Sequence, residues 1–215
     1  MKEYHKINTI YKRNEHTKKI IEGDYSIPEF EYLKNNLWSF SEKLDGTCIR
    51  IIYDSNRITF GGKTDNASIP SKLLNNLITQ FYPLESIFKE MFTPKETDEL
   101  NESNVCLYGE GVGAKIQSGG GNYSADQKFI LFDIKIGNWW LKRKDVEDIA
   151  NKLNLEIVPI IGEGTLGEAI VLAKTGIKST YGDFKAEGIV ARPKVELFTR
   201  GGHRIITKIK SRDFK

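Results

Sequence analysis

The sequence predicts an α+β fold built mostly of antiparallel strands with flanking helices. Short runs of β-branched and aromatic residues recur along the chain, separated by glycine-rich or Asp/Asn turns, which is typical of strands joined by hairpins. Segments 70–92 and 144–153 instead carry apolar residues at helical spacing. Neither a repeat nor a linker interrupts residues 1–215, so we expect a single domain with residues 1–35 as an N-terminal lead-in.

The composition excludes several classes of protein. Hydrophobic residues make up 39% and aromatic residues 11% of the chain, which indicates a folded protein. The net charge is only +3, so any binding of nucleic acid must depend on local basic patches. Two cysteines are expected to be reduced thiols in a cytoplasm, that of a host cell if the protein is phage-encoded. No apolar run approaches the roughly 20 residues that span a membrane.

The first half of the chain alternates between strands and helices. Residues 50–53 and 57–60 flank Asp54-Ser55-Asn56 and are expected to form a hairpin. The helical spacing in 70–92 is divided into two helices by Pro83. An acidic surface loop, 95–104, then leads into a strand at 105–108.

The second half continues this alternation. A glycine-rich loop precedes an apolar strand at 129–134, and a helix follows at 144–153. The remaining expected elements are a strand at 157–161, a helix near 166–174, a strand at 188–191, a turn at 200–203 and a strand at 204–210.

A lysine beside a tight turn is the first candidate for chemistry. Lys43 stands two residues before Asp45-Gly46, and strand-forming residues follow. Such a lysine is either a solvated loop residue or a nucleophile, since an amine attacks phosphorus once its environment lowers its pKa. Four positions alone do not decide between these two interpretations.

Further candidates follow along the chain, each with a structural alternative. Glu110 lies between glycines and is either a ligand-binding group or a turn carboxylate. Glu187 begins a strand and is either functional or an edge charge. Phe132, which precedes Asp133, either packs in the core or stacks on a base. Lys208 and Lys210 share one face of a strand, which is otherwise explained as a solvated face.

These residues together suit nucleotidyl transfer. A triphosphate needs cations and a divalent metal, which carboxylates hold, and an aromatic ring binds the base. Paired lysines stabilise charge on the α-phosphate and on its leaving group.

The same residues, in this order, resemble the covalent nucleotidyltransferase superfamily of ATP-dependent DNA and RNA ligases and mRNA capping enzymes. The matching segments are Glu42-Lys43-Leu44-Asp45-Gly46-Thr47, Leu107-Tyr108-Gly109-Glu110, Phe129-Ile130-Leu131-Phe132-Asp133-Ile134, Ala186-Glu187-Gly188-Ile189-Val190 and Lys208-Ile209-Lys210. Within this superfamily the local sequence is most similar to the RNA ligases, in the segments Asp45-Gly46-Thr47, Gly109-Glu110-Gly111-x-Gly113 and Lys115-Ile116-Gln117. The resemblance implies the nucleotidyltransferase (ATP-grasp-like) ligase fold.

The resemblance also implies a three-step reaction that uses ATP and Mg²⁺ or Mn²⁺. Lys43 would attack the α-phosphate and become lysyl-AMP, the AMP would pass to an RNA 5′-phosphate, and a 3′-hydroxyl would seal the strand. Phe132 would stack on adenine and Glu42 would read its edge through the backbone, while Glu110 and Glu187 would serve the ribose and the metal. The nucleotide-binding set it implies is Glu42, Lys43, Asp45, Gly46, Lys63, Glu110, Phe132, Glu187, Lys208 and Lys210, with Lys43, Lys208 and Lys210 as the catalytic residues.

Two positions depart from the RNA ligase pattern. Cys48 stands where asparagine is common, and a thiol replaces an amide poorly as a hydrogen-bonding group. Lys63 stands where arginine is common, which keeps the charge but loses the bidentate fork. Both put contacts to phosphates and RNA ends in question rather than the adenylation.

The substrate follows from the same resemblance. After Lys210 only five residues remain, so we expect no C-terminal accessory domain and a monomer that holds a nicked RNA duplex by itself. The candidate cations for this contact are Lys63, Lys115, Lys128, Arg192, Lys194, Arg200 and Arg204. A DNA ligase, a capping-type enzyme and an inactive nucleic-acid-binding relative remain alternatives.

Overall fold

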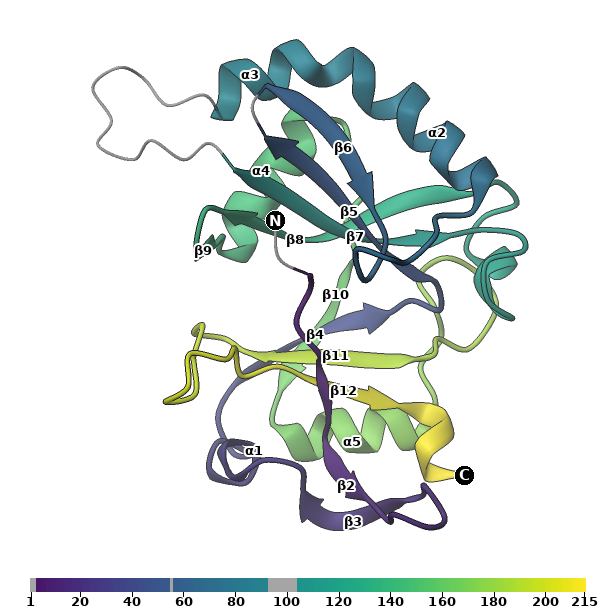
Figure 1. Ribbon diagram of the computed structural model, residues 1–215. Helices are drawn as coiled ribbons and strands as arrows, with labels where there is room; N and C mark the ends of the chain where they lie inside the picture. The colour runs from purple at the N-terminus through teal and green to yellow at the C-terminus, as the bar shows by residue number, and fades with distance from the viewer. Residues whose placement is uncertain (1–2, 55, 93–103) are drawn as a thin grey trace. The chain divides into compact units, whose positions relative to one another are not determined.

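The computed structural model describes residues 3–54, 56–92 and 104–215, and its contacts separate two compact units (Figure 1). Unit 1 comprises Met1–Tyr4 and Asp45–Val158, and unit 2 comprises His5–Leu44 and Pro159–Lys215. Each unit contains its own sheet and its own hydrophobic core. The expected α+β fold with mostly antiparallel strands is confirmed, whereas the single-domain organisation stays a prediction.

The sheet of unit 1 has the strand order β6-β5-β7-β8-β9, and every neighbouring pair is antiparallel. Its strands are β5 (Thr47–Asp54), β6 (Arg57–Gly61), β7 (Val105–Val112), β8 (Lys128–Ile136) and β9 (Trp139–Trp140). The pairing of β5 with β6 confirms the predicted hairpin, although Ser55 in its turn lies outside the described residues. The predicted acidic loop 95–104 also lies outside them, except for Asn104.

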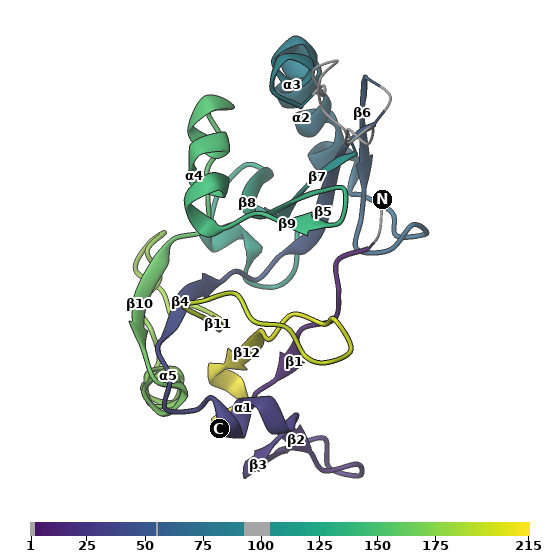
Figure 2. The ribbon, with the colours of Figure 1, turned by 90° about the vertical axis from the view of Figure 1, so that its left-hand side faces the viewer.

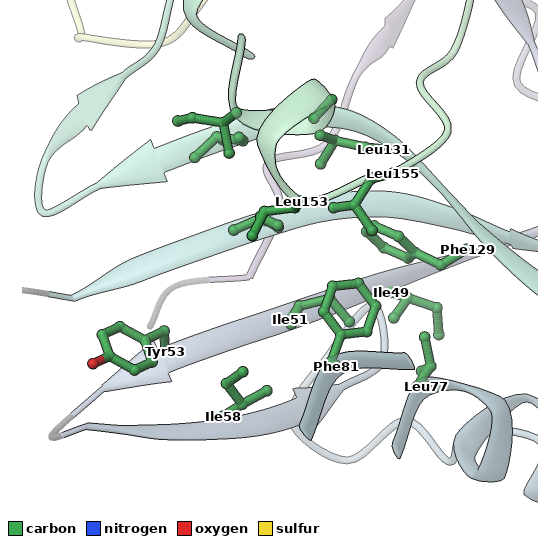
Figure 3. Close-up of a cluster of buried hydrophobic side chains, with 14 of the residues drawn as sticks. Ile49, Ile51, Tyr53, Ile58, Leu77, Phe81, Phe129, Leu131, Leu153 and Leu155 are labelled. Atoms are coloured by element: carbon green, nitrogen blue, oxygen red, sulfur yellow. The ribbon is translucent and has the colours of Figure 1, made fainter. Parts of the chain in front are cut away.

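Helices cover one face of this sheet. The predicted pair is α2 (Ser71–Phe81) and α3 (Glu85–Phe92), separated by the short 3₁₀-helix η1 (Tyr82–Leu84) that contains Pro83, and the third helix is α4 (Arg143–Lys152). A further 3₁₀-helix, η2 (Gly120–Asn122), lies in the glycine-rich loop. Figure 3 shows the resulting core, in which Ile49 and Ile51 of β5 face Leu77 and Phe81 of α2 together with Phe129 of β8.

The sheet of unit 2 has the order β1-β12-β11-β4-β10. Its strands are β1 (Asn8–Thr9), β4 (Trp38–Lys43), β10 (Ile160–Gly164), β11 (Gly188–Pro193) and β12 (Thr207–Lys210). β1 runs parallel to β12 and the other pairs are antiparallel. Residues 5–35 of the N-terminal lead-in are therefore part of this unit, and they also supply β2 (Tyr11–Arg13), β3 (Ile20–Tyr25) and α1 (Pro28–Tyr32).

Helix α5 (Leu166–Thr175) packs against β11 and β12 (Figure 1, Figure 2). Its N-terminus is closed by a capping box between Thr165 and Glu168, which satisfies two backbone N–H groups. The chain ends in the 3₁₀-helix η3 (Ser211–Phe214). Side chains alternate across β4, so Trp38 and Phe40 enter the core while Ser41 and Lys43 lie on the more accessible face.

Two predicted strands begin later than expected. The strand predicted at 157–161 starts at Ile160, since Pro159 has no N–H to donate to a ladder, and Ile157 makes only an isolated bridge to Leu131. The strand predicted at 204–210 starts at Thr207, while Arg204 belongs to a hairpin. Among the helices of the described residues, none is long and apolar enough to cross a membrane.

Candidate active site

The carboxylate of Glu187 joins two of the predicted catalytic lysines in unit 2. Its Oε2 lies 2.6 Å from Nζ of Lys43, and its Oε1 lies 2.6 Å from Nζ of Lys210. The lysine amine of Lys43 also donates to the carbonyl oxygen of Leu44 at 3.2 Å. These side chains are only partly shielded, at 20% exposure for Lys43, 16% for Lys210 and 11% for Glu187. The structure thus brings together three residues that are far apart in the sequence.

Strand register explains this meeting. β11 lies between β4 and β12, and Gly188 is opposite both Lys43 and Lys210. A Cβ at Gly188 would collide with the carbonyl oxygen of Ile209, so a glycine is needed where the strands approach most closely. Lys208 is one pleat away from Lys210 and opposite Val190, on the same face of β12, as the sequence predicted.

Glu187 is electrostatically matched to this position. Burial by itself raises the pKa of a carboxyl, but the charge of Lys43 and hydrogen bonds from Lys210 and Lys43 outweigh it. The pKa of Glu187 therefore lies below its usual value, and the group is a carboxylate at neutral pH. The two ammonium groups consequently share one partly buried negative charge.

Glu42 is buried on the opposite face of β4. Its side chain is 1% exposed and accepts hydrogen bonds from Ser179 Oγ at 2.6 Å and from the N–H and Oγ1 of Thr180, both at 2.9 Å. Its backbone N–H donates to the carbonyl oxygen of Pro159 at 3.2 Å. Recognition of a base edge by the Glu42 backbone stays a prediction and would have to use its carbonyl group.

The contact between Glu42 and residues 179–180 was not found by sequence reasoning. The available signal is the period of two in β4, which places Glu42 on the same face as Trp38 and Phe40. A carboxylate on a buried face requires hydrogen-bond donors, but the sequence does not show which residues supply them.

In unit 1, the backbone at Gly46 lies close to Glu110 and Gly111. A Cβ at Gly46 would collide with the carbonyl oxygen of Gly111 and lie 2.7 Å from Cγ of Glu110. Asp45 accepts a hydrogen bond from the N–H of Gly119 at 3.0 Å, so it anchors the glycine-rich loop. Cys48 pairs directly with Glu110 across β5 and β7. The glycine of the Asp-Gly pair is therefore required by close packing.

Burial disfavours ionisation of both cysteine thiols. Burial, followed by the charge of Glu110, raises the pKa of Cys48 to about 12. Burial likewise raises the pKa of Cys106 to about 12. Both groups are therefore neutral thiols at physiological pH.

Phe132 occupies a β-bulge. Tyr108 pairs with Asp133 and the next residue, Gly109, pairs with Leu131, so Phe132 is the extra residue of β8. Bulges redirect side chains and are frequent beside active sites. The ring of Tyr4 meets that of Phe132 edge-on at 5.1 Å, and its hydroxyl donates to Oδ2 of the fully buried Asp133 at 2.8 Å. This role of Tyr4 carries no signal in the sequence.

Lys63 lies on an exposed turn that is held by contacts to the buried side chain of Arg50. Arg50 is 1% exposed, and its Nε donates to the carbonyl oxygen of Gly62 at 2.8 Å. Its guanidinium also binds Asp65 at 2.7 Å. Arg50 therefore clamps both sides of Lys63, and its alternation with apolar residues in β5 was the only available signal of burial.

The metal ion implied by the resemblance would need ligands from the substrate as well as from the protein. Groups of three or more His, Cys, Asp or Glu side chains able to hold a metal are absent from residues 3–54, 56–92 and 104–215. Glu110 belongs to unit 1 and Glu187 to unit 2, and both oxygens of Glu187 bind lysines. Mg²⁺ is commonly held by one or two carboxylates plus substrate phosphates, so a role of Glu110 or Glu187 as a metal ligand stays a prediction.

The predicted RNA-contacting cations have different surroundings. Lys128 pairs with Glu156 and Lys194 with Glu163, while Arg204 is buried against Glu196. The exposed ones are Lys63, Lys115, Lys194 and Arg200, and Arg192 is half-buried. A cavity of about 590 Å³ in unit 2 is lined by Phe40, Val171 and Leu172 among others, and it contains none of the predicted site residues.

Comparison with known proteins completes this picture. The model of the RNA ligase family matches residues 36–210. No curated protein sequence matches the chain. Among solved structures, a variant of the Naegleria gruberi RNA ligase with AMP and Mn is similar, with a TM-score of 0.65 and 20% identity over 87% of this chain and 53% of that chain. The N. gruberi ligase with PPi gives a TM-score of 0.64 at 20% identity, again over 87% and 53%.

This chain thus spans about half the length of the solved ligases that it matches. At this level of identity the likeness shows the fold alone. The match of the family model covers most of the chain and includes every residue of the lysine–glutamate cluster. The chain belongs to the RNA ligase family.

Proposed function

We propose that the chain is an ATP-dependent RNA ligase that works through a lysyl-AMP intermediate on Lys43. The observation that carries the proposal is the contact of Glu187 with Lys43 and Lys210, which places a candidate nucleophile beside a second cation. Membership of the RNA ligase family and a fold shared with N. gruberi ligase structures that contain ATP and Mn support it.

In the first step, the Lys43 amine attacks the α-phosphorus of ATP. A nitrogen–phosphorus bond forms, the bond to the β-phosphate oxygen breaks, and pyrophosphate leaves. The amine must give up a proton, because only its lone pair is nucleophilic. Glu187 orients this amine from 2.6 Å in the protein without nucleotide.

Lys208 and Lys210 stabilise the negative charge that develops in this step. Both are on one face of β12, and Lys210 is already positioned by Glu187. Cations preorganised at the site of charge development lower the barrier without further rearrangement. Glu187 or Glu110 would hold Mg²⁺ or Mn²⁺ together with phosphate oxygens, and the metal would supply further charge neutralisation.

Residues of unit 1 bind the remaining parts of ATP in this proposal. Phe132 stacks on adenine, because its position at a bulge turns the ring away from the regular ladder. Glu110 binds the ribose, and a glycine is needed at position 46 because the Glu110 side chain lies close to the backbone there. Asp45 holds the glycine-rich loop through Gly119, and Lys63 contacts phosphate from the turn that Arg50 fixes.

The later steps use RNA ends. The AMP passes to a 5′-phosphate, and a 3′-hydroxyl then attacks that phosphate and releases AMP. We propose that a nicked duplex is the preferred substrate of a monomer, since base pairing aligns the two ends. Preference for RNA over DNA on the 3′-hydroxyl side would depend on the 2′-hydroxyl.

Covalent labelling tests the first step. Incubation with labelled ATP and Mg²⁺ or Mn²⁺ should label the wild type, whereas Lys43→Ala and Lys43→Arg should remain unlabelled. Lys12→Ala is the matched control, because Lys12 is another lysine of unit 2 paired with a carboxylate. Labelling of either folded Lys43 variant would refute the assignment, and labelling by GTP instead of ATP would favour a capping-type enzyme.

The supporting residues and the substrate are tested in the same way. Alanine at Glu187, Lys208 or Lys210 should slow adenylation at least about tenfold, which corresponds to about 1.4 kcal/mol of barrier. Nicks with RNA or DNA on the 3′-hydroxyl side then test sealing. Sealing of DNA nicks alone would contradict the choice of RNA, and adenylation without any sealing would contradict the ligase proposal.

A further inference from the structure

The connection between β11 and β12 contains a hairpin with an exposed tip. The connection spans residues 194–206 and is the yellow-green loop joining these strands in Figure 1, and the hairpin comprises residues 194–204. Phe198 bridges to Arg204, and the N–H of Thr199 donates to the carbonyl oxygen of His203 at 2.8 Å. Gly202, with φ of 78°, closes the turn in a backbone conformation that favours glycine.

An ion pair between the buried Arg204 and the more exposed Glu196 ties the base of this hairpin. The guanidinium of Arg204 binds both carboxylate oxygens of Glu196, and the Arg204 side chain is only 2% exposed. Bidentate pairs of this kind fix geometry as well as charge. Leu197 packs against the core of unit 2 on the same arm. The tip is therefore a fixed platform on unit 2.

This platform presents apolar and basic side chains to solvent. Val195 is 71% and Phe198 is 50% exposed, although large apolar side chains are usually covered. Arg200 and His203 are exposed at the tip. The other charges of the hairpin are balanced locally, since Lys194 pairs with Glu163 and Arg204 with Glu196. Arg200 thus gives the tip a positive charge beside an apolar surface.

The hairpin and the cluster of Lys43, Glu187 and Lys210 lie at opposite ends of β11. Lys210 and Lys43 are opposite Gly188, at one end of β11, whereas the hairpin begins after Pro193, at the other end. Five intervals of about 3.3–3.4 Å separate these ends by roughly 17 Å. An RNA strand whose end lies at Lys43 would reach the hairpin only at nucleotides away from that end.

We propose that hairpin 194–204 grips the RNA backbone at a distance from the sealed junction. Arg200 contacts a phosphate, and Phe198 and Val195 pack against ribose groups in the wide, shallow minor groove of the RNA duplex. This inference rests on the proposed function for its substrate, and it adds a binding surface that the shared motifs do not contain.

Fluorescence anisotropy with a labelled, 5′-phosphorylated nicked RNA duplex tests the proposal, at about 50 and about 200 mM salt. Arg200→Gln should weaken binding and reduce the salt slope by about 1, whereas Arg200→Lys should restore the slope. Phe198→Ala should weaken binding about threefold or more at both salt concentrations, and Phe198→Tyr should restore it, because the lost contact is apolar. Lys178→Gln is the matched control, since Lys178 is an exposed lysine on another hairpin of unit 2.

The yield of adenylated protein is measured first for each variant, so that failure of the chemistry is distinguished from failure of RNA binding. Sealing rates are then compared at equal adenylated fraction, and the hairpin variants should seal more slowly at limiting RNA. Unchanged affinity and salt slope in folded Phe198→Ala and Arg200→Gln would overturn the proposal. A change of self-association in Phe198→Ala without any change in RNA affinity would also overturn it, because the exposed surface would then serve a protein contact.

Discussion

Glu42 and Lys43 are adjacent in β4, yet their side chains contact opposite ends of the segment 179–187. Glu42 accepts hydrogen bonds from Ser179 and Thr180, while Lys43 binds Glu187. Successive side chains in a strand point to opposite faces, so one strand end fixes the segment from both sides of the sheet. The position of Glu187 is thereby linked to a buried carboxylate that does not touch it directly.

Removal of the Glu42 carboxylate should therefore cost both stability and adenylation. Glu42→Ala leaves the buried donors of Ser179 and Thr180 without partners, and we expect the free energy of unfolding to fall by about 1–3 kcal/mol or more. Glu42→Gln keeps one acceptor and should cost less. Urea denaturation measures the first effect and labelling with ATP the second. Equal stability of wild type and Glu42→Ala would contradict this role.

The lowered pKa of Glu187 predicts a pH-dependent contribution to stability. Its folded pKa is below the unfolded value of about 4.3, so the contribution is complete above that pH and is lost as pH falls through the folded pKa. The difference in unfolding free energy between wild type and Glu187→Gln should shrink as the pH falls below about 4.3, the unfolded value. Lys12→Ala, which removes an exposed pair, is the control. A difference that stays constant over this range would exclude the coupling.

The aromatic contacts around the bulge predict two separable effects. Phe132→Ala should weaken ATP binding by about 1–3 kcal/mol, the usual value of stacking on a base. Tyr4→Phe keeps the ring against Phe132 but removes the hydroxyl bound to buried Asp133, so it should mainly lower stability, by about 1–3 kcal/mol. Nucleotide titration and thermal unfolding distinguish these outcomes. Unaltered ATP affinity in Phe132→Ala would remove Phe132 from the nucleotide site.

Cys48 should be chemically inert and replaceable. Because burial raises its pKa to about 12, it should react slowly with a thiol reagent at pH 8 compared with a small free thiol. Cys48→Ala should adenylate at a rate close to that of the wild type, and Cys48→Asn should preserve or improve sealing. Rates are measured with labelled ATP and with a nicked RNA. A large loss of sealing in Cys48→Ala would reveal a function of the thiol.

The types of the elements and the order of the candidate motifs were predictable from local sequence patterns. Local periodicity was sufficient for the hairpin of β5 and β6, for the helices on either side of Pro83, and for the common face of Lys208 and Lys210. These features depend on neighbours within a few residues, so the pattern of side chains contains them.

The contacts between residues distant in the chain could not be predicted in this way. The register of β4, β11 and β12 places Gly188 between Lys43 and Lys210, and no local pattern specifies that register. The same holds for buried charge, because a sequence does not show the partner that a buried ion requires. Arg204, expected at an RNA surface, is buried and paired with Glu196, whereas nearby Arg200 is exposed, since burial follows from packing between segments that are remote in the chain.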